Sequence, residues 1–436
     1  MFYLFALSLC AEAKEKYAIM IDAGSSGTRA HIYHWFKTGS LPNVQPAPDR
    51  HNGWVLKSKV PLAKAAKNLS KIQEIFDPII KFGVEKIPKR MIPETRIFVY
   101  ATAGVRLLDE KNQEKVISNT FNYLKTHSPF KIKPRYVRAI TGIEEGIYGW
   151  LSVNHLLGKF TKGQTTVGAL DMGGASKQIA VQIDERVRTP SEHVVDLGYT
   201  RIKLFAHSYL GYGANEALKT VSAHLRGKVS AGETYENPCY PPGYTGEEKG
   251  YTINGTGKYD ECVDLVRNVL IADESFSSVK IPEGTDEYVA MASFFYLNDF
   301  LKLPQNSTLK ELHEASKAFC ERKWSDIEAE YPDNSYVKTY CWYGTYQWAM
   351  MTYGYHFTDE KTKVFKAEDI DSVDLSWTIG AMLKEASTIE FDEIAHFSLA
   401  PIFLGNFIAF GIVFPLFFIT ERKKGTYSIV QSSKMV

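Results

Sequence analysis

The chain has 436 residues, and its 51 Lys and Arg residues nearly balance its 50 Asp and Glu residues, for a formal net charge of +1. Acidic and basic residues are interspersed, so the sequence has no basic field that would bind nucleic acid, and we exclude that class of partner. The length suffices for two domains of ordinary size, each with a substantial hydrophobic core.

The chain begins with a short apolar run at 2–9, followed by Ala11-Glu12-Ala13. The small-x-small pattern is typical of a signal-peptidase site. We therefore expect residues 1–13 to be a signal peptide that is removed. Because the run lacks a basic start, a truncated membrane anchor is the alternative interpretation.

The first predicted unit of the mature chain is a strand, a turn and a second strand. The apolar strand 17–22 ends in Asp22, the turn is rich in Gly and Ser, and 29–36 form the second strand around the sequence IDAGSSGTR at 21–29. Gly and Ser in such a turn let backbone N–H groups converge on an anion, and the hydroxyls add further donors. The pattern predicts a phosphate-binding turn.

Nearly the same pattern recurs at 170–178, LDMGGASKQ, where Asp171 takes the place of Asp22. Either copy alone is equally consistent with a plain strand and tight turn, but the repeat predicts two phosphate-binding turns that face each other across a cleft. Two carboxylates would repel a phosphate, and a divalent cation between them removes that objection. The sequence contains no GxxxxGK[ST] motif, and no GxGxxG follows a strand.

Strands and helices alternate between and after these turns, so the fold class is α/β. The pattern predicts a loop over 38–54, helices over 62–82, 109–126 and 142–157, and strands over 96–100 and 131–138. We expect a helix-rich stretch from Glu192 onwards, a long surface loop over 236–259 and a final helix that begins at Ser376.

Two further places carry candidate chemistry. Thr102 follows a strand as Asp22 ends one, so its hydroxyl is a candidate for the same phosphate, and a plain strand-capping role fits equally well. Glu144 and Glu145 stand together at a helix start. Consecutive helical residues point about 100° apart, so only one of the two faces a cleft. Stabilisation of the helix N-terminus is the alternative role for this pair.

Cysteine usage indicates an oxidising compartment. Once Cys10 leaves with the signal peptide, Cys239, Cys262, Cys320 and Cys341 remain, which predicts two disulfides. Of the three possible connectivities we favour nearest neighbours, Cys239 with Cys262 and Cys320 with Cys341. A metal site is disfavoured because no CxxC or matching His pair is present.

The C-terminal region predicts a membrane anchor. Residues 397–420 carry no charge and are long enough to cross a bilayer as a helix, and the basic tail 421–436 belongs in the cytosol. This leaves 14–396 on the lumenal or outer side and predicts a single-pass type I membrane protein. Sequons in that part are candidate glycosylation sites at Asn68, Asn254 and Asn306.

Five segments taken together resemble a known family. IDAGSSGTR, ATAGVRLL, TGIEEGIYGW, LDMGGASKQIA and ASFFYLNDFL occur in the order and approximate spacing of the signature regions of the nucleoside di- and triphosphate phosphohydrolases, the apyrase or E-type ATPase family. The resemblance runs from about Tyr17 to Leu383. It implies an actin-like fold, with two ribonuclease-H-like domains that flank a nucleotide cleft. We expect the first domain over 14–150, joined by part of 376–395, and the second over 151–375.

The resemblance also implies roles for individual residues. One phosphate is expected to bind Ser25, Ser26, Gly27 and Thr28 of the first domain, with Thr102 nearby, and Gly173, Gly174 and Ala175 of the second. Asp22 and Asp171 are expected to hold Ca²⁺ or Mg²⁺ through its water ligands. Glu145 matches the general base, and Ser176 and Gln178 match groups that position the attacking water. Tyr296 and Trp377 match residues that bind the nucleobase, although an aromatic run such as FFY is also typical of a core.

Two features depart from the family pattern. Lys177 stands where neutral residues are usual, and we expect it to face solvent, with proximity to phosphate as the alternative. The stretch 354–361 lacks an Arg that some surface-exposed members carry.

The small number of lumenal cysteines looks more like the endomembrane branch, whose members hydrolyse UDP and GDP released by glycosyltransferases. The leading hypothesis is a metal-dependent nucleoside diphosphatase of the ER or Golgi lumen that uses direct attack by water. A cell-surface apyrase acting on ATP and ADP is the first alternative. A sugar kinase of the same superfold is disfavoured by the Glu pair, and a non-catalytic type I membrane glycoprotein is disfavoured by the presence of Glu145, Asp22 and Asp171. No oligomeric state is predicted.

Overall fold

The computed structural model describes residues 15–36, 41–49, 51, 53–198 and 200–404. The signal peptide expected at 1–13 and the tail at 421–436 lie outside the described residues, as does most of the membrane span expected at 397–420. Within the described ranges, none of the helices combines the length and apolarity that crossing a bilayer requires. The described residues up to Glu390 form one compact unit.

The first sheet contains the first predicted strand-turn-strand unit. Its strands are β1 (Lys16–Ala23), β2 (Thr28–Trp35), β3 (Gln45–Pro46), β4 (Val55–Ser58), β5 (Arg96–Ala101) and β6 (Val137–Ala139). They follow the order β3-β2-β1-β5-β6, with β4 also paired to β2. β1 and β2 form an antiparallel hairpin, and β5 lies parallel to β1 on its other side.

The second sheet repeats this arrangement. Its strands are β7 (Gly168–Met172), β8 (Ser176–Gln182), β9 (Glu192–Asp196), β10 (Arg201–Leu210), β14 (Glu287–Ala292) and β15 (Lys363–Lys366), in the order β15-β14-β7-β8-β10-β9. β7 and β8 form the hairpin, and β14 is parallel to β7. The two Gly-rich turns therefore occupy equivalent places in two sheets of the same design.

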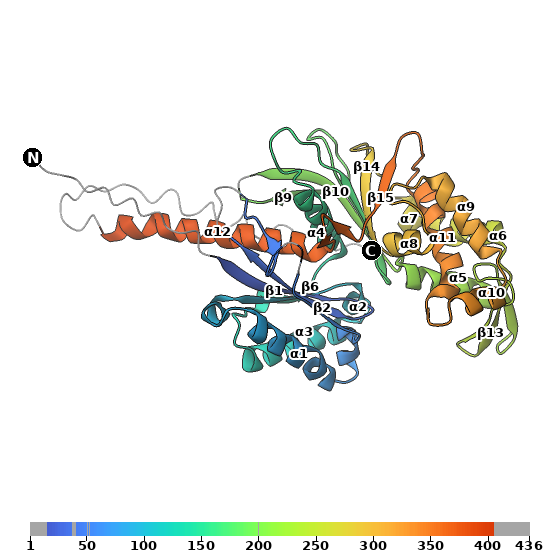
Figure 1. The fold of residues 1–436 in the computed structure, drawn as a ribbon, viewed down its shortest axis with the longest axis horizontal. Helices are drawn as coiled ribbons and strands as arrows, with labels where there is room; N and C mark the ends of the chain where they lie inside the picture. The colour runs from blue at the N-terminus through green and yellow to red at the C-terminus, as the bar shows by residue number, and fades with distance from the viewer. Residues whose placement is uncertain (1–14, 37–40, 50, 52, 199, 405–436) are drawn as a thin grey trace, which may run out of the picture. The chain divides into compact units, whose positions relative to one another are not determined.

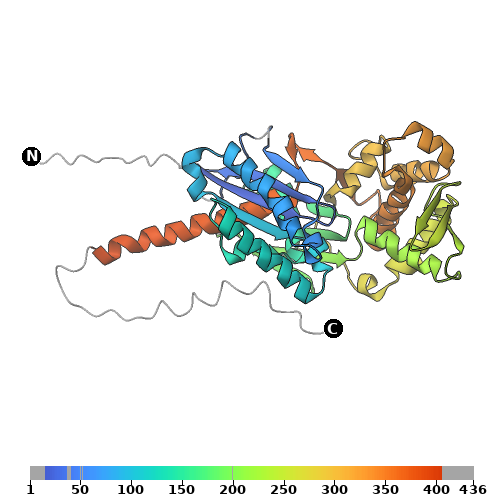
Figure 2. The same cartoon turned by 90° about the horizontal axis from the view of Figure 1, so that it is seen from below.

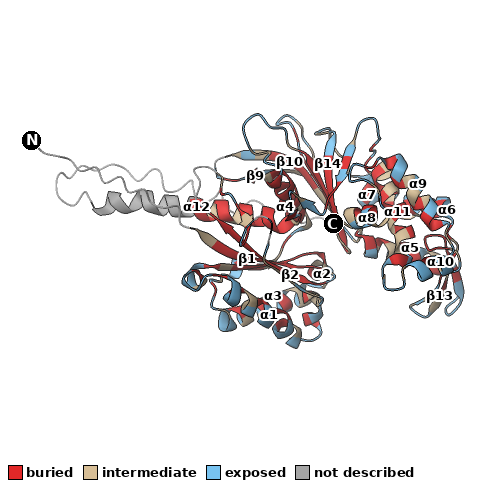
Figure 3. Ribbon diagram, in the orientation of Figure 1, coloured by how far each residue is buried: buried red, intermediate tan, exposed pale blue. Residues whose placement is uncertain are grey.

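Helices cover these sheets (Figures 1 and 2). α1 (Ser70–Lys86) and α3 (Glu110–His127) pack on the outer face of the first sheet. α4 (Gly142–Leu156) and the first part of α12 (Trp377–Leu404) share a core with residues of both sheets, and this central layer is mostly buried in Figure 3. The first sheet holds α12 through hydrogen bonds from Tyr33 to Thr378 at 2.7 Å, from Tyr100 to Glu385 at 2.6 Å and from Trp35 to Glu390 at 3.0 Å.

A helical region covers the face of the second sheet opposite α4. Its helices are α5 (Ala214–Arg226), α6 (Tyr259–Leu265), α7 (Glu274–Ser277), α8 (Ser293–Phe300), α9 (Leu309–Cys320), α10 (Trp324–Glu330) and α11 (Tyr340–Ala349), with π-helical turns at Val266–Ile271 and Met350–Gly354. The remaining short elements are α2 (Ala103–Arg106), β16 (Asp369–Ile370), β17 (Val373–Asp374) and 3₁₀ turns at Leu62–Ala66, Lys89–Glu94, Pro134–Tyr136 and Val337–Thr339. The predicted disulfides Cys239–Cys262 and Cys320–Cys341 are both present, which confirms the nearest-neighbour pairing.

The structure corrects several predicted elements. The stretch that follows Glu192 is not helical at its start: β9 and β10 form there because β10 pairs with β9 over 201–205 and with β8 over 204–210, and buries side chains on both faces. Most of 131–138 is not a strand, since apart from an isolated bridge between Lys131 and Arg96 the pairing with β5 is confined to 137–139. The expected loop at 236–259 contains most of a small sheet, β11 (Thr234–Asn237), β12 (Thr245–Glu248) and β13 (Tyr251–Gly255), because Tyr-rich strands pack together there.

The crossing of α12 over α4 yields a stability prediction. Gly380 donates its backbone N–H to the Ser152 hydroxyl at 2.9 Å, and a Cβ at Gly380 would lie 2.0 Å from the Tyr148 carbonyl oxygen. Gly380→Ala must therefore separate the two helices, and we expect the free energy of unfolding to fall by about 1–3 kcal/mol. Gly149→Ala in α4 is the control, because its Cβ would only touch the Met291 methyl group at 3.6 Å. Urea denaturation measures both, and equal stability would contradict the close crossing.

Candidate active site

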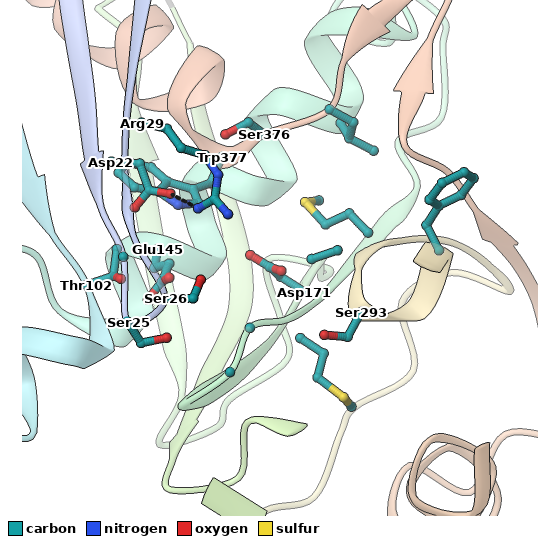
Figure 4. A pocket seen from close by; sticks show the side chains of 18 of the residues that line it. Asp22, Ser25, Ser26, Arg29, Thr102, Glu145, Asp171, Ser293, Ser376 and Trp377 are labelled. Atoms are coloured by element: carbon teal, nitrogen blue, oxygen red, sulfur yellow. Dashed lines mark ion pairs between the residues drawn. The ribbon is translucent and has the colours of Figure 1, made fainter. Parts of the chain in front are cut away.

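A cavity of about 230 Å³ lies where the turns of the two hairpins approach each other (Figure 4). We call it the central cavity. It takes residues from both turns, from the end of β5, from α4, from α8 and from the segment that leads into α12. The predicted site residues that line it are Asp22, Ser25, Ser26, Thr102, Glu145, Asp171, Gly173, Gly174, Tyr296 and Trp377.

The two turns have the same backbone construction. In the first, the Gly24 N–H donates to the Gly27 carbonyl at 2.9 Å, and in the second the Gly173 N–H donates to the Ser176 carbonyl at 3.0 Å. Each aspartate sits near the end of its hairpin strand, Asp22 opposite Arg29 and Asp171 opposite Gln178. The local repeat in the sequence is therefore a repeat in space.

Three of the predicted phosphate ligands, Gly27, Thr28 and Ala175, do not line the cavity. Thr28 differs from the expectation most clearly: its side chain is fully buried and donates a hydrogen bond to the Val60 carbonyl at 2.9 Å. The Thr28 hydroxyl is therefore engaged by the backbone of a neighbouring segment of the same chain and does not line the cavity. Gly27 lies against Ser58 and Ala175 is buried, which leaves Ser25 and Ser26 as the hydroxyl residues of the first turn that line the cavity.

Asp22 and Asp171 are buried carboxylates in this cavity. Burial, together with the nearby Glu145 charge, raises the pKa of Asp22 to about 7 although Arg29 opposes the shift. Burial and the charges of Glu145 and Asp22 raise the pKa of Asp171 to about 7 as well. Arg29 approaches Asp22 at 3.6 Å, and it is the ion pair drawn in Figure 4. The cavity holds more negative charge than its own cations offset.

This pair of carboxylates fits a hard divalent cation. The Oδ1 atom of Asp22 is buried without a hydrogen-bond partner among the described residues, as expected for an oxygen that serves an ion or its hydration shell. The described residues contain no group of three or more His, Cys, Asp or Glu side chains arranged as a metal site. Two aspartates alone cannot complete the shell of such an ion, so water ligands fit better than direct coordination by a protein cage.

Glu145 is the centre of a hydrogen-bonded network. Its Oε2 accepts from the Arg106 guanidinium at 2.8 Å and from the Gln178 amide at 3.2 Å. Gln178 also donates to Ser176 at 2.9 Å and to Ser208 at 3.1 Å, and Arg106 donates to Ser176 at 3.2 Å. Burial raises the pKa of Glu145, and the Arg106 charge and hydrogen bond act in the opposite direction. The network joins all three residues expected to handle the attacking water.

The neighbouring Glu144 has a different task. It accepts from the Thr141 N–H at 2.8 Å and donates its own N–H to the Thr141 hydroxyl at 3.1 Å, which forms a capping box at the start of α4. Its other contact is an ion pair with Arg138 at 2.8 Å. Of the two consecutive glutamates, only Glu145 lines the cavity, as their angular separation on the helix predicts.

Gly142 allows this network to form. A Cβ at Gly142 would lie 2.1 Å from the Ser208 hydroxyl, so only glycine lets β10 approach the start of α4 this closely. The helix that carries Glu145 therefore lies directly against the strands that carry Gln178 and Ser208.

The two aromatic candidates differ in their surroundings. Tyr296 in α8 lines the cavity and keeps 54% of its surface exposed, so its ring is available to a ligand. Trp377 is buried and stacks on Tyr148 with centroids 6.4 Å apart, so it is part of the core at the cavity wall. Phe295 also lines the cavity beside Tyr296.

Sequence reasoning missed three residues of the site and misplaced a fourth. Arg29 ends the motif IDAGSSGTR, and Arg106 stands within ATAGVRLL. An Arg beside a phosphate-type turn is a signal in the sequence that points to a site residue. Ser208 carried no signal, because its strand was expected to be helical. Lys177 does not face solvent: its side chain is completely buried on the reverse face of β8.

The candidate glycosylation sites differ in access. Asn68 and Asn306 are exposed, whereas Asn254 in β13 is partly buried. Glycosylation at these sites stays a prediction.

Comparison with known proteins identifies the family. The sequence profile of the GDA1/CD39 (nucleoside phosphatase) family matches residues 8–398. The chain belongs to this family. It is therefore a nucleoside phosphate hydrolase, an enzyme that cleaves phosphoanhydride bonds, and the family depends on divalent cations.

Similar curated proteins include the mouse ectonucleoside triphosphate diphosphohydrolase 3, which is 29% identical over 89% of this chain and 82% of its own length. The Caenorhabditis elegans nucleoside-diphosphatase mig-23 is 27% identical over 85% of this chain and 77% of its own length. Among solved structures, a nucleoside triphosphate hydrolase from Neospora caninum matches with a TM-score of 0.64 and 16% identity, over 86% of this chain and 93% of that chain. The fold is the actin-like nucleotide-hydrolase fold.

The buried aspartates predict how stability depends on pH without metal. Their folded-state pKa values of about 7 lie above the ordinary value, so the folded protein binds protons more tightly than the unfolded chain between about pH 4 and pH 7. The free energy of unfolding should therefore fall as pH rises through this window, by at most about 1.4 kcal/mol per pH unit for each carboxylate, and level off above it.

Urea denaturation in the presence of a chelator measures this slope. The variant Asp22→Asn with Asp171→Asn should flatten it, and added Ca²⁺ or Mg²⁺ should restore wild-type stability at the alkaline end. A wild-type slope that the double variant leaves unchanged would mean that these aspartates are not the titrating groups.

Proposed function

We propose that this chain hydrolyses the terminal phosphate of nucleoside diphosphates, chiefly UDP and GDP, in a divalent-cation-dependent reaction in the lumen of the secretory pathway. The observation that carries the proposal is the Glu145 network, which lies in the same cavity as two facing phosphate-type turns and two buried aspartates. A general base, water-positioning groups and anion-binding turns are what phosphoanhydride hydrolysis requires.

The turns bind the phosphates. The hydroxyls of Ser25 and Ser26 and the backbone N–H of Gly174 hold the terminal phosphate from opposite sides, with Gly173 lining the same turn and the Thr102 hydroxyl as a further donor. Asp22 and Asp171 would hold the divalent cation, which would supply positive charge next to the phosphate oxygens. Convergent donors stabilise charge on the phosphoryl group as the bond to the leaving group lengthens.

Glu145 takes the proton from the attacking water. Both of its protein hydrogen bonds reach Oε2, so Oε1 is the oxygen oriented to receive a proton. The Oε1 atom of Gln178 is buried without a partner among the described residues, and it accepts the second O–H of the same water. Burial raises the pKa of Glu145 toward the working range of a general base, and the charge and hydrogen bond of Arg106 oppose that rise and favour the carboxylate form.

The reaction needs no covalent intermediate. The water oxygen forms the new bond to the terminal phosphorus while the bond to the bridging oxygen breaks, and the water proton passes to Glu145. Cys239, Cys262, Cys320 and Cys341 are paired in disulfides, and Ser25 and Ser26 are assigned to phosphate binding, so the mechanism calls on none of these residues as a nucleophile.

Substitution of the base tests this assignment. Glu145→Gln removes proton acceptance but keeps the size and most hydrogen bonds of the side chain, so turnover should fall by about 10²–10⁴-fold while metal-nucleotide binding persists. The matched control is Glu144→Gln, which weakens the α4 cap but should keep most of the turnover. Phosphate release and nucleotide affinity measure both variants. Turnover in Glu145→Gln above a few per cent of wild type would rule out the role.

The preference for UDP and GDP rests on the number of disulfides and on one relative. The lumenal part carries two disulfides, which resembles the endomembrane branch, and one relative is a nucleoside-diphosphatase by name. The similarity to a mouse ectonucleoside triphosphate diphosphohydrolase favours the second candidate, a cell-surface enzyme that acts on ATP and ADP. The single-pass topology, the lumenal location and the domain boundaries 14–150 and 151–375 remain part of this proposal.

A nucleotide panel separates these candidates. Purified full-length protein should release phosphate from UDP and GDP at least about tenfold faster, by kcat/KM, than from ATP, a difference of about 1.4 kcal/mol in transition-state binding. The assay uses Ca²⁺ and Mg²⁺ separately, with chelator as the blank. Faster hydrolysis of ATP would favour the cell-surface alternative, and absence of hydrolysis with every nucleotide would favour a non-catalytic membrane glycoprotein.

A further inference from the structure

Lys177 is a buried lysine directly behind the proposed catalytic strand. It stands in β8 between Ser176 and Gln178, and because side chains alternate along a strand it points to the opposite face of the sheet. The side chain is 0% exposed, and its Nζ has no hydrogen-bond partner among the described residues. A lysine so completely buried without a polar partner calls for a physical explanation.

Aromatic rings surround the Lys177 Nζ, and we call these rings the aromatic box. The distances from Nζ to the ring centroids are 4.4 Å for Phe276, 4.7 Å for Tyr355, 5.1 Å for Tyr209, 5.7 Å for Tyr346 and 5.9 Å for Tyr212. The rings come from β10, the loop after it, α7, α11 and the segment after the second π-helical turn. Segments far apart in the sequence therefore build one site around a single ammonium group.

The aromatic box is joined to the second phosphate turn. The loop after β10 holds that turn by backbone bonds: the Gly211 N–H donates to the Ala175 carbonyl at 2.8 Å, and the Ala214 N–H donates to the Gly173 carbonyl at 2.9 Å. Tyr212 lies between these two contacts, and its own carbonyl accepts the Tyr346 hydroxyl at 2.5 Å. Two rings of the box thus belong to the structure that clamps residues 173–175.

The surroundings favour the charged form of Lys177 in one way and oppose it in another. Burial lowers the pKa of the amine well below its ordinary value. The negative faces of five rings attract an ammonium and act in the opposite direction, most strongly where water is excluded. We assign the ammonium form, because five ring faces stabilise a cation much more than a neutral amine.

The titratable groups next to Lys177 carry no compensating charge. Burial raises the pKa of Tyr209, Tyr212, Tyr346 and Tyr355, so their hydroxyls stay neutral. His207 on β10 is also neutral, because burial lowers its pKa. No carboxylate in the described chain forms an ion pair with Lys177, so its positive charge is not cancelled locally.

We propose that Lys177 is a positioning residue for phosphate binding: its boxed ammonium anchors the turn 173–175 and places an uncompensated positive charge behind the substrate phosphates. The inference rests on the proposed function, because it assumes that phosphates bind at that turn. A buried charge is poorly screened, so it acts on the cavity through the thickness of the sheet. The charge adds to the donors of the turn without touching the substrate.

The test removes the charge and keeps the length of the side chain. Lys177→Met should weaken binding of UDP and raise its KM by about five- to tenfold, with a smaller change in kcat, because a fixed charge binds ground state and transition state alike. The control is Lys203→Met on the adjacent strand β10. Lys203 is also buried, with 5% of its surface exposed, but its charge is paired with Glu192 at 3.2 Å, so its loss should leave the KM for UDP unchanged.

Four outcomes are decisive. A KM increase confined to Lys177→Met supports the proposal. Wild-type KM in Lys177→Met, or equal losses in both variants, overturns it. A wild-type protein that neither binds nor hydrolyses UDP refutes the proposed function instead, so the two failures are distinguishable.

A spectroscopic measurement on the wild-type protein covers the case in which Lys177→Met does not fold. Lysine labelled with ¹⁵N at Nζ gives separate signals for ammonium and amine, and a buried Nζ exchanges slowly with solvent. At neutral pH we expect a slowly exchanging ammonium signal that shifts when UDP binds. A buried amine signal, or an ammonium signal insensitive to UDP, overturns the proposal.

Discussion

The constraint on which this structure depends is the concentration of buried negative charge in the central cavity. Asp22, Glu145 and Asp171 line the same space. Burial raises the pKa of all three carboxyl groups, and the charge of Glu145 also raises the pKa of both aspartates. Buried carboxylates persist only where something offsets their charge. Each offsetting group in this site has a distinct position: Arg106 on Glu145, Arg29 on Asp22, and a bound cation that the two aspartates are suited to hold.

The scaffold makes this concentration possible by duplication. Two sheets of the same topology each present a hairpin. Its turn begins with a glycine, and its first strand carries an aspartate next to the last residue. Helix α4 then brings Glu145 between them, and close approaches at Gly142 and Gly380 allow α4 to touch both β10 and α12. The packing of these elements, more than any local propensity, fixes the distance between the base and the turns.

How far the sequence predicts this site depends on whether the signal is local. The two hairpins were predictable because a strand, an aspartate and a Gly-rich turn are adjacent in the chain, and the disulfides were predictable from cysteine count and spacing. Ser208 was not, because its place beside Gln178 arises only when β10 pairs with β8. The sequence pattern predicts a helix-rich stretch where the strands at 192–210 lie, since a continuous apolar run does not by itself distinguish a buried strand from a buried helix.

Lys177 is a second residue whose place is decided by segments that are distant in the sequence. Alternation along β8 correctly separates it from Ser176 and Gln178, but the rings that cover the reverse face come from distant segments, so an exposed position was the natural expectation for a lysine. Burial there has an electrostatic consequence. Arg29 and Arg106 each form an ion pair with one carboxylate, whereas no carboxylate of the described residues pairs with Lys177, so the proposed ammonium would act on an anion that occupies the cavity.

The balance of these charges also constrains how substrate enters. The cavity is lined by five carboxylates, those of Asp22, Glu145, Asp171, Glu368 and Asp374, and by two cations, Arg29 and Lys57. A free diphosphate would therefore meet net negative charge on the side of the aspartates. A diphosphate already complexed with a divalent cation presents positive charge to Asp22 and Asp171 and leaves its outer oxygens for the two turns. The same arrangement that makes the empty cavity costly therefore favours the metal complex of the nucleotide, and not the free nucleotide, as the species that binds.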